Sequence, residues 1–164
     1  MAAGNTYTQI ASTTLGSTAN TVTFSSIAAT YTDLVLVINA QCQTSSGQGL
    51  YLQYNSDTAT NYSSTVLYGN GSSALTTRTS SQVKAGIGNI DTSNYGTTIV
   101  NIQNYSNATT YKTAISRSNA PANYVLSYVS LWRATAAINS LTILLDTAPF
   151  NSGSTFNLYG ITSA

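Results

Sequence analysis

The chain has 164 residues and a mass of 17.2 kDa, which is enough for one domain with a hydrophobic core and short for two. Charged residues make up only 5% of it, against about 25% in an average soluble domain. The formal charge of +1, the absence of a basic cluster and the absence of an apolar run near the roughly 20 residues that span a bilayer argue against nucleic acid and membrane as partners.

Apolar and β-branched residues recur with a period of two along most of the chain, which is the spacing of β-strands. Residues 33–42 begin apolar on both faces, as in a central strand that is covered on both sides. In residues 123–132, Val125 and Val129 share one face, and Leu126 and Trp132 share the other. In chain order, strands are predicted at residues 7–11, 21–25, 33–42, 48–54, 65–68, 83–90, 97–103, 110–116, 123–132, 138–145 and 155–161.

Turn-forming residues such as Gly69-Asn70-Gly71 and Ser152-Gly153 separate these segments. Many short strands and no good helical stripe predict an all-β, antiparallel, jelly-roll-like β-sandwich. We expect a single domain over residues 1–164, with a short N-terminal arm at 1–6 and no signal peptide. An Ala-rich stretch at 131–139 is the one candidate for a helical turn. The final strand, 155–161, is expected to lie near the first one, which would tie down the end of the chain.

Two residues are predicted to be buried for packing alone. Cys42 is the single cysteine, so it forms no internal disulfide, and it follows an apolar run that favours a small buried hydrophobe. Trp132 lies in one of the most apolar predicted strands, and we expect it in the core.

Catalytic chemistry has few candidates in this sequence. There is no histidine, so triads that depend on it cannot form within the chain, and the acids are four isolated aspartates. Folding could bring two of these aspartates together, and that alternative stays open. We nevertheless expect that the protein is not an enzyme. Zinc has no ligand set, and the candidate calcium loop at 55–61 offers one carboxylate. The sequence therefore predicts neither a metal nor a cofactor.

A sugar is the most reasonable small ligand, because aromatic faces next to amides and carboxylates are typical of saccharide sites. The tyrosines at 51, 54, 62 and 68 lie near Asn55, Asp57, Asn61 and Asn70 in the sequence. Tyrosine is also an ordinary strand residue, and this simpler interpretation is favoured. If a glycan does bind, we expect its contacts to be Tyr54, Asn55, Asp57, Asn61 and Tyr62.

Three stretches together resemble a family of small virion proteins of tailed phages, common among phages of aquatic bacteria. They are residues 24–36 (FSSIAATYTDLVL), residues 52–63 (LQYNSDTATNYS) with 67–71 (LYGNG) after them, and residues 153–161 (GSTFNLYGI). The likeness spans nearly the whole chain in order and spacing. This chain departs from the family at the second stretch, which usually reads closer to Asn-Gly-Asp-Thr-Gly: Ser56 and Ala59 stand at the two glycine positions.

The resemblance implies a structural protein of the virion. The scarcity of charge favours a surface that partners cover, because net charge is what keeps exposed proteins apart in solution. We therefore expect a homotrimeric capsid decoration (cement) protein that sits on the capsid surface and strengthens contacts between subunits of the major capsid protein. The alternative is a tail-fibre or tail-tip module that binds host-surface glycans.

Overall fold

The computed structural model describes residues 6–43, 47–122 and 124–162, and within these ranges it is all-β without a helix. The fold class predicted from the sequence is therefore confirmed. The candidate helical turn at 131–139 is instead the end of a strand, at Trp132, followed by a loop. Most of the predicted N-terminal arm, residues 1–5, lies outside the described residues.

The described residues form twelve strands, and each of the predicted segments overlaps one of them. The strand missing from the prediction is β6, which is rich in serine and threonine and has no apolar alternation. The strands are β1 (Tyr7–Thr14), β2 (Thr21–Phe24), β3 (Asp33–Ala40), β4 (Gln48–Tyr54), β5 (Tyr62–Gly69), β6 (Ala74–Gln82), β7 (Ala85–Ile90), β8 (Gly96–Ile102), β9 (Lys112–Ala120), β10 (Tyr124–Trp132), β11 (Leu141–Leu145) and β12 (Thr155–Ile161).

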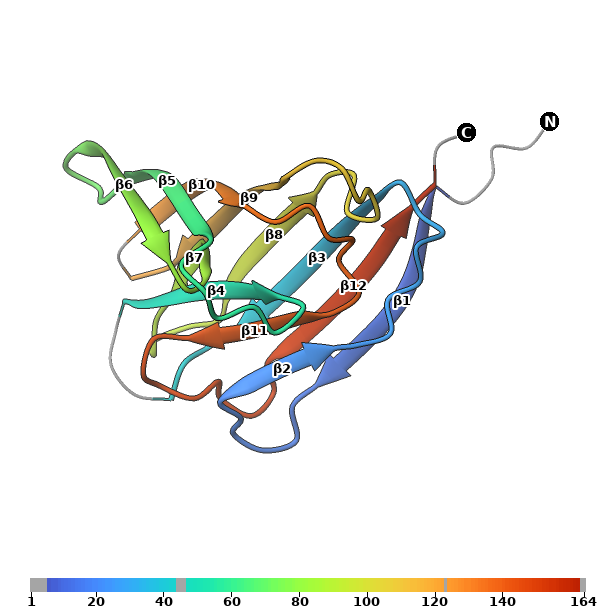
Figure 1. The fold of residues 1–164 in the computed structure, drawn as a ribbon. Helices are drawn as coiled ribbons and strands as arrows, with labels where there is room; N and C mark the ends of the chain where they lie inside the picture. The colour runs from blue at the N-terminus through green and yellow to red at the C-terminus, as the bar shows by residue number, and fades with distance from the viewer. Residues whose placement is uncertain (1–5, 44–46, 123, 163–164) are drawn as a thin grey trace.

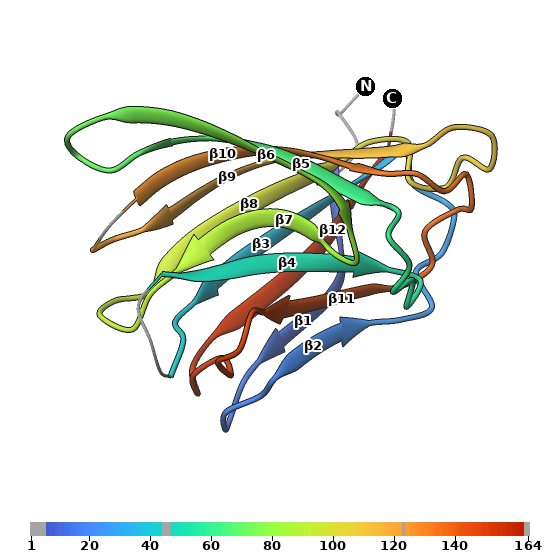
Figure 2. The same cartoon turned by 60° about the vertical axis from the view of Figure 1, so that its left-hand side comes forward.

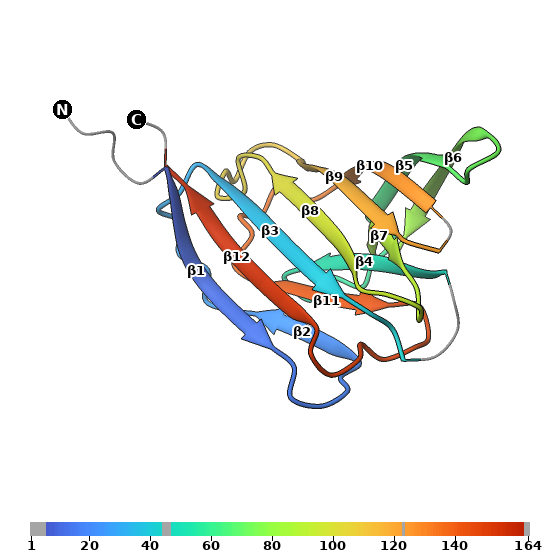
Figure 3. The same ribbon diagram turned by 180° about the vertical axis from the view of Figure 1, so that it is seen from behind.

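Eight of these strands form a jelly roll. The order β1-β12-β3-β8 in the larger sheet faces the order β2-β11-β4-β7 in the smaller one, and every pairing is antiparallel (Figures 1 and 3). Strands β1 and β12 are hydrogen-bonded neighbours, with Tyr7 opposite Ile161. The expectation that the first and last strands lie together is thus confirmed.

Two inserted hairpins, β5–β6 and β9–β10, widen only the larger sheet, whose order continues β8-β9-β10-β5-β6. The smaller sheet ends at β7 and gains no matching strands. Figure 2 shows β5 and β6 reaching past β7. All nine residues of β6 are exposed, so this end of the larger sheet overhangs the sandwich.

The core fills the space between the two sheets with aliphatic and aromatic side chains. Cys42 is 1% exposed, as predicted, and Phe150 packs edge-on against Phe156 with ring centroids 5.0 Å apart. The fully buried aliphatic residues of the central strands are Leu34, Leu36, Ile38, Leu50, Leu52, Val100, Ile102, Leu141 and Ile143.

Under the widened part of the larger sheet the interior is polar. Strand β7 is the edge of the smaller sheet, so the backbone groups on its free side need partners other than a neighbouring strand. Gly86 N donates to one serine Oγ at 2.9 Å, and Gly86 O accepts from another. Ile87 O accepts a serine hydroxyl at 2.6 Å, and a further serine bonds both N and O of Asn89 at 3.3 Å. We call these four residues of β5, β9 and β10 the serine row: Ser64, Ser116, Ser118 and Ser130.

Glycines in β7 let the two sheets approach closely enough for these bonds. A Cβ atom on Gly88 would lie 2.5 Å from Ser118 Oγ, and one on Gly86 would lie 2.9 Å from the ring of Tyr128. Both distances are shorter than real contacts allow. The sequence Ala-Gly-Ile-Gly of β7 therefore alternates residues whose side chains face the core with glycines that leave room for the serine row and Tyr128.

Replacing Ser130 by alanine tests this arrangement. Ser130→Ala leaves the buried carbonyl of Gly86 without its side-chain donor, so we expect a loss of about 1–3 kcal/mol in the free energy of unfolding, measured in urea. The exposed Ser80 of β6 provides the control, because Ser80→Ala should change stability by less than about 0.5 kcal/mol. Equal stability of the two variants would show that the serine row does not hold β7.

Candidate functional site

The five residues predicted to contact a glycan lie together, at the end of β4, in the loop 55–61 and at the start of β5. At their centre is the carboxylate of Asp57. Its Oδ2 accepts hydrogen bonds from Trp132 Nε1 at 2.7 Å and Asn61 Nδ2 at 2.8 Å, and its Oδ1 accepts from Ala59 N at 2.8 Å. Burial alone would raise the pKa of Asp57, but these three donors together hold that pKa below its ordinary value.

The aromatic residues of this cluster are packed against one another. The ring of Trp132 lies 5.3 Å from that of Tyr54 and 6.4 Å from that of Tyr62, centroid to centroid. Their exposures are 2%, 1% and 0%, so Trp132 is a core residue, as predicted. The hydroxyl of Tyr62 donates to Asp57 O at 3.0 Å and accepts from Tyr54 N at 3.1 Å, which ties the two strand ends together.

Asn55 fastens the loop to the segment before β11. Its Oδ1 accepts from Asn139 N at 2.9 Å and Ser140 N at 3.2 Å, while its Nδ2 donates to Ala137 O at 2.8 Å. Both Asn55 and Ser56 have positive φ, 52° and 57°. Ser56, which stands at a glycine position of the resembling family, thus adopts a backbone conformation that favours glycine.

These contacts correct the expectation that Tyr54 and Tyr62 meet a glycan, because neither ring has an exposed face. The polar side chains of Asn55, Asp57 and Asn61 are all used in hydrogen bonds within the loop or to the strands beside it. The cluster joins β4, β5, β10 and the segment before β11.

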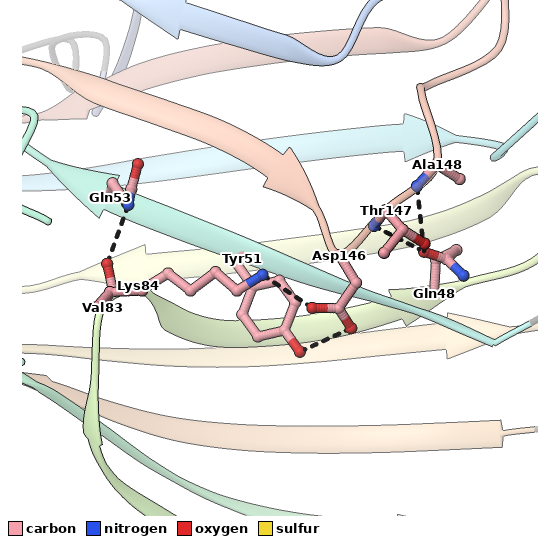
Figure 4. A network of polar contacts seen from close by, with 8 residues as sticks. All are labelled: Gln48, Tyr51, Gln53, Val83, Lys84, Asp146, Thr147 and Ala148. Atoms are coloured by element: carbon pink, nitrogen blue, oxygen red, sulfur yellow. Dashed lines mark hydrogen bonds and ion pairs between the residues drawn. The ribbon is translucent and has the colours of Figure 1, made fainter.

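Of the other tyrosines and amides considered for sugar binding, Tyr51 and Asn70 are also engaged. Figure 4 shows Tyr51 donating to Asp146 at 3.1 Å, with Lys84 Nζ 2.8 Å from the same carboxylate and 3.9 Å from the centre of the tyrosine ring. This is the only ion pair within the described ranges. Asn70 Oδ1 accepts backbone N–H groups of its own turn. The last tyrosine considered for sugar binding, Tyr68, lies away from this cluster, on the inner side of the overhanging end of the larger sheet.

The remaining carboxylates also serve the backbone. Asp33 accepts from Asn104 N at 2.7 Å, and Asp91 accepts from Ser93 N and Ala122 N, both at 2.9 Å. Among the residues that the structure describes, no three His, Cys, Asp or Glu side chains gather where they could hold a metal ion.

A buried cation was not anticipated. Lys112 is 1% exposed, its Nζ donates to Thr110 O at 2.6 Å and Thr135 O at 3.0 Å, and burial lowers its pKa. Alternation along residues 110–116 places Tyr111, Thr113 and Ile115 on one face of this strand, and that face is the exposed one. The same alternation places Lys112 on the inward face of the strand, so its burial could have been predicted from the sequence.

The outer face of the larger sheet, turned away from the smaller sheet, carries the most exposed aliphatic side chains of the described residues. Val125 is 70% exposed, Leu67 63%, Val129 53% and Ile115 48%. They come from three adjacent strands, β5, β10 and β9, and Val129 is directly opposite Ile115 (Figure 3). We call this surface, which continues over Val37 and Ile99 of β3 and β8, the outer face.

A charged side chain, Arg117, lies within the outer face. Arg117 lies in register between Ser127 of β10 and Ile99 of β8. Within the described part of the chain it makes no ion pair or hydrogen bond. Three hollows of about 630, 650 and 260 Å³ include it in their walls. The surface is therefore apolar, grooved and centred on an unpaired cation.

Comparisons with known proteins give no relative: no protein-family model matches the chain, and no curated protein sequence matches it. Over the residues described, no helix is long and apolar enough to cross a membrane.

Removing the central ring of the aromatic cluster should be costly. Trp132→Ala deletes a buried indole and the donor to Asp57, so we expect a loss of about 3–5 kcal/mol in the free energy of unfolding. Tyr111→Ala, at a residue that is 57% exposed, should leave the melting temperature nearly unchanged. A Trp132→Ala variant that melts with the wild type would contradict the placement of the ring in the core.

Tyr62 should make the fold sensitive to alkali. Burial is the main cause that raises its pKa from 10.0 to about 12, so the folded protein keeps the phenol neutral where the unfolded chain ionises it. The resulting stability is fully present below pH 10.0 and is lost as the pH rises to about 12. Urea midpoints should fall over this interval in the wild type and less steeply in Tyr62→Phe. If the urea midpoints of the wild type and of Tyr62→Phe fell with the same slope, this role of Tyr62 would be contradicted.

Proposed function

We propose that this protein is a structural, non-catalytic component of a phage virion, a capsid decoration protein that docks through the outer face. The observation that carries the proposal is the contiguous apolar surface formed by Leu67, Ile115, Val125 and Val129. Monomeric proteins rarely expose large contiguous apolar patches, and those that are exposed commonly mark interaction sites.

The chemistry of the outer face fits a protein partner. Exposed valine, leucine and isoleucine side chains supply apolar area, and Arg117 supplies one cation without an internal partner. Apolar centres with an isolated arginine are typical of protein interfaces. The partner, which we propose to be the major capsid protein, would place a carboxylate or backbone carbonyl groups against Arg117.

Two further features support an assembled state. A net charge of +1 gives the free protein little electrostatic protection against association. A homotrimer with closed symmetry would let one chain meet equivalent positions of a shell. Jelly rolls occur in viral capsid domains and in lectins, so the fold agrees with the proposal without selecting it. The phage context itself rests on the family resemblance of the sequence.

The copy number in purified virions tests the place in the particle. A decoration protein should be present in a fixed ratio to the major capsid protein, at hundreds of copies for a typical shell. A few copies, or a few tens, would reject the decoration role and place the chain in the tail.

A charge on the outer face should abolish docking. Val129→Asp introduces a carboxylate at an exposed apolar centre, so we expect at least a thirtyfold weaker rebinding to particles stripped of the protein, equivalent to about 2 kcal/mol. Val83→Asp is the matched control, since Val83 is 42% exposed but lies between β6 and β7, outside the outer face. Equal rebinding of the two variants, both folded, would reject the outer face as the docking surface.

A further inference from the structure

Figure 2 shows β5 and β10 passing beyond the edge of the smaller sheet. A pocket opens on the inner side of this overhang. It holds about 340 Å³, which is near the lower end of the roughly 300–1,000 Å³ of small-ligand sites. We call it the tyrosine pocket, and its principal lining residues are Val66, Tyr68, Asn89, Tyr124, Leu126 and Tyr128.

Aromatic rings and hydroxyls dominate its walls. Tyr68 and Tyr124 meet edge to face, with centroids 5.7 Å apart and planes at 83°. Within the described ranges, none of the hydroxyls of Tyr68, Tyr124 and Tyr128 has a hydrogen-bond partner. The pocket therefore offers ring surfaces together with three groups that can donate or accept hydrogen bonds.

An unpaired oxygen lies in the same wall. Asn89 Nδ2 donates to Gly47 O at 3.2 Å, but Asn89 Oδ1 is the one buried side-chain oxygen or nitrogen of the described residues without a hydrogen-bond partner. A buried acceptor without a donor is costly, so such an atom in a native protein calls for a partner, either an ordered water or a ligand. Neighbouring side chains cover Oδ1 in the free protein, and a ligand donor would reach it after the kind of rotamer change that often accompanies binding.

The electrostatics of the pocket select a neutral ligand. No Asp, Glu, Lys or Arg is among its lining residues. Lys84 lines only the adjoining hollow of about 180 Å³, and its charge is paired with Asp146 at 2.8 Å. A charged ligand would lose its hydration without gaining a counter-ion.

We propose that the tyrosine pocket binds a neutral saccharide, with one pyranose ring against the tyrosines and a ligand hydroxyl or amide N–H donating to Asn89 Oδ1. A sugar presents both a C–H face, which packs on aromatic rings, and several hydroxyls, which meet the three tyrosine hydroxyls. A purely apolar ligand would leave Oδ1 unpaired. The pocket is on the opposite side of the larger sheet from the outer face, so this site is independent of the docking proposed above.

The adjoining hollow extends the site along the overhang. It shares Val66 and Tyr128 with the tyrosine pocket and continues over the hydroxyls of Ser64, Thr77 and Thr79. A linear oligosaccharide lying between β7 and β5–β6 would occupy both hollows. We therefore expect a trimer of a recognised sugar to bind more tightly than the single sugar.

The test is a titration of the isotope-labelled protein followed by amide chemical shifts. The probes are glucose, galactose, mannose and N-acetylglucosamine, with maltotriose and cellotriose as linear trimers and sialic acid as a charged control. We expect at least one neutral probe to shift the amides of Asn89, Tyr124 and Leu126 with a dissociation constant of about 1 mM, the affinity typical of so small a ligand. Sialic acid should cause no shift there.

Variants separate recognition from folding. Tyr124→Ala should weaken binding about tenfold. Tyr68→Phe, which removes only a hydroxyl, gives a second, milder perturbation and should weaken it severalfold. Tyr111→Ala alters an exposed tyrosine away from the pocket and should bind as the wild type does. Shifts from none of the neutral probes, shifts located elsewhere, or equal binding by Tyr124→Ala and Tyr111→Ala would overturn the proposal and leave Asn89 Oδ1 as the site of an ordered water.

Discussion

The hydrogen bonds between the serine row and the free edge of β7 set the arrangement of the two sheets. A sheet edge inside a protein would ordinarily leave backbone groups without partners. Here hydroxyls of the facing sheet take the place of the missing strand, and Gly86 and Gly88 remove the side chains that would keep the sheets apart. The smaller sheet can therefore stop at β7 while the larger sheet continues for several strands.

That mismatch in width gives the protein two surfaces of different chemistry. On one side of the larger sheet the outer face is apolar and centred on Arg117. On the other side, beyond β7, the overhang presents tyrosines, hydroxyls and the amide of Asn89. The outer face suits a protein partner, and the inner side of the overhang suits a small neutral ligand. Since they lie on opposite sides of the same strands, both could be occupied at once.

Much of the fold was readable from the sequence because burial on alternate residues leaves a period of two. Strand β6 was not predicted, because all of its residues are exposed and burial therefore imposes no alternation of apolar and polar residues on it. The residues of loop 55–61 were grouped in the sequence as possible glycan contacts, but neighbours in the sequence do not reveal that Trp132, far along the chain, donates a hydrogen bond to Asp57. Serines occur both in loops and in strands, so their positions in the sequence do not predict that the serine row faces the free edge of β7. Likewise, residues 123–132 have apolar side chains on both faces, and this pattern does not reveal that one of those faces is the outer face.

The topology of the jelly roll has a consequence for how the chain folds as it is synthesised. Strand β12 lies between β1 and β3, and β11 lies between β2 and β4, so the last strands to leave the ribosome separate strands made near the start. Until they emerge, β1 and β2 have no partner, and β3 and β4 each have an open edge. Such edges are prone to pairing with other chains, and non-local sheets form slowly. Until β11 and β12 have been synthesised, the nascent chain therefore carries unpaired strand edges that favour aggregation.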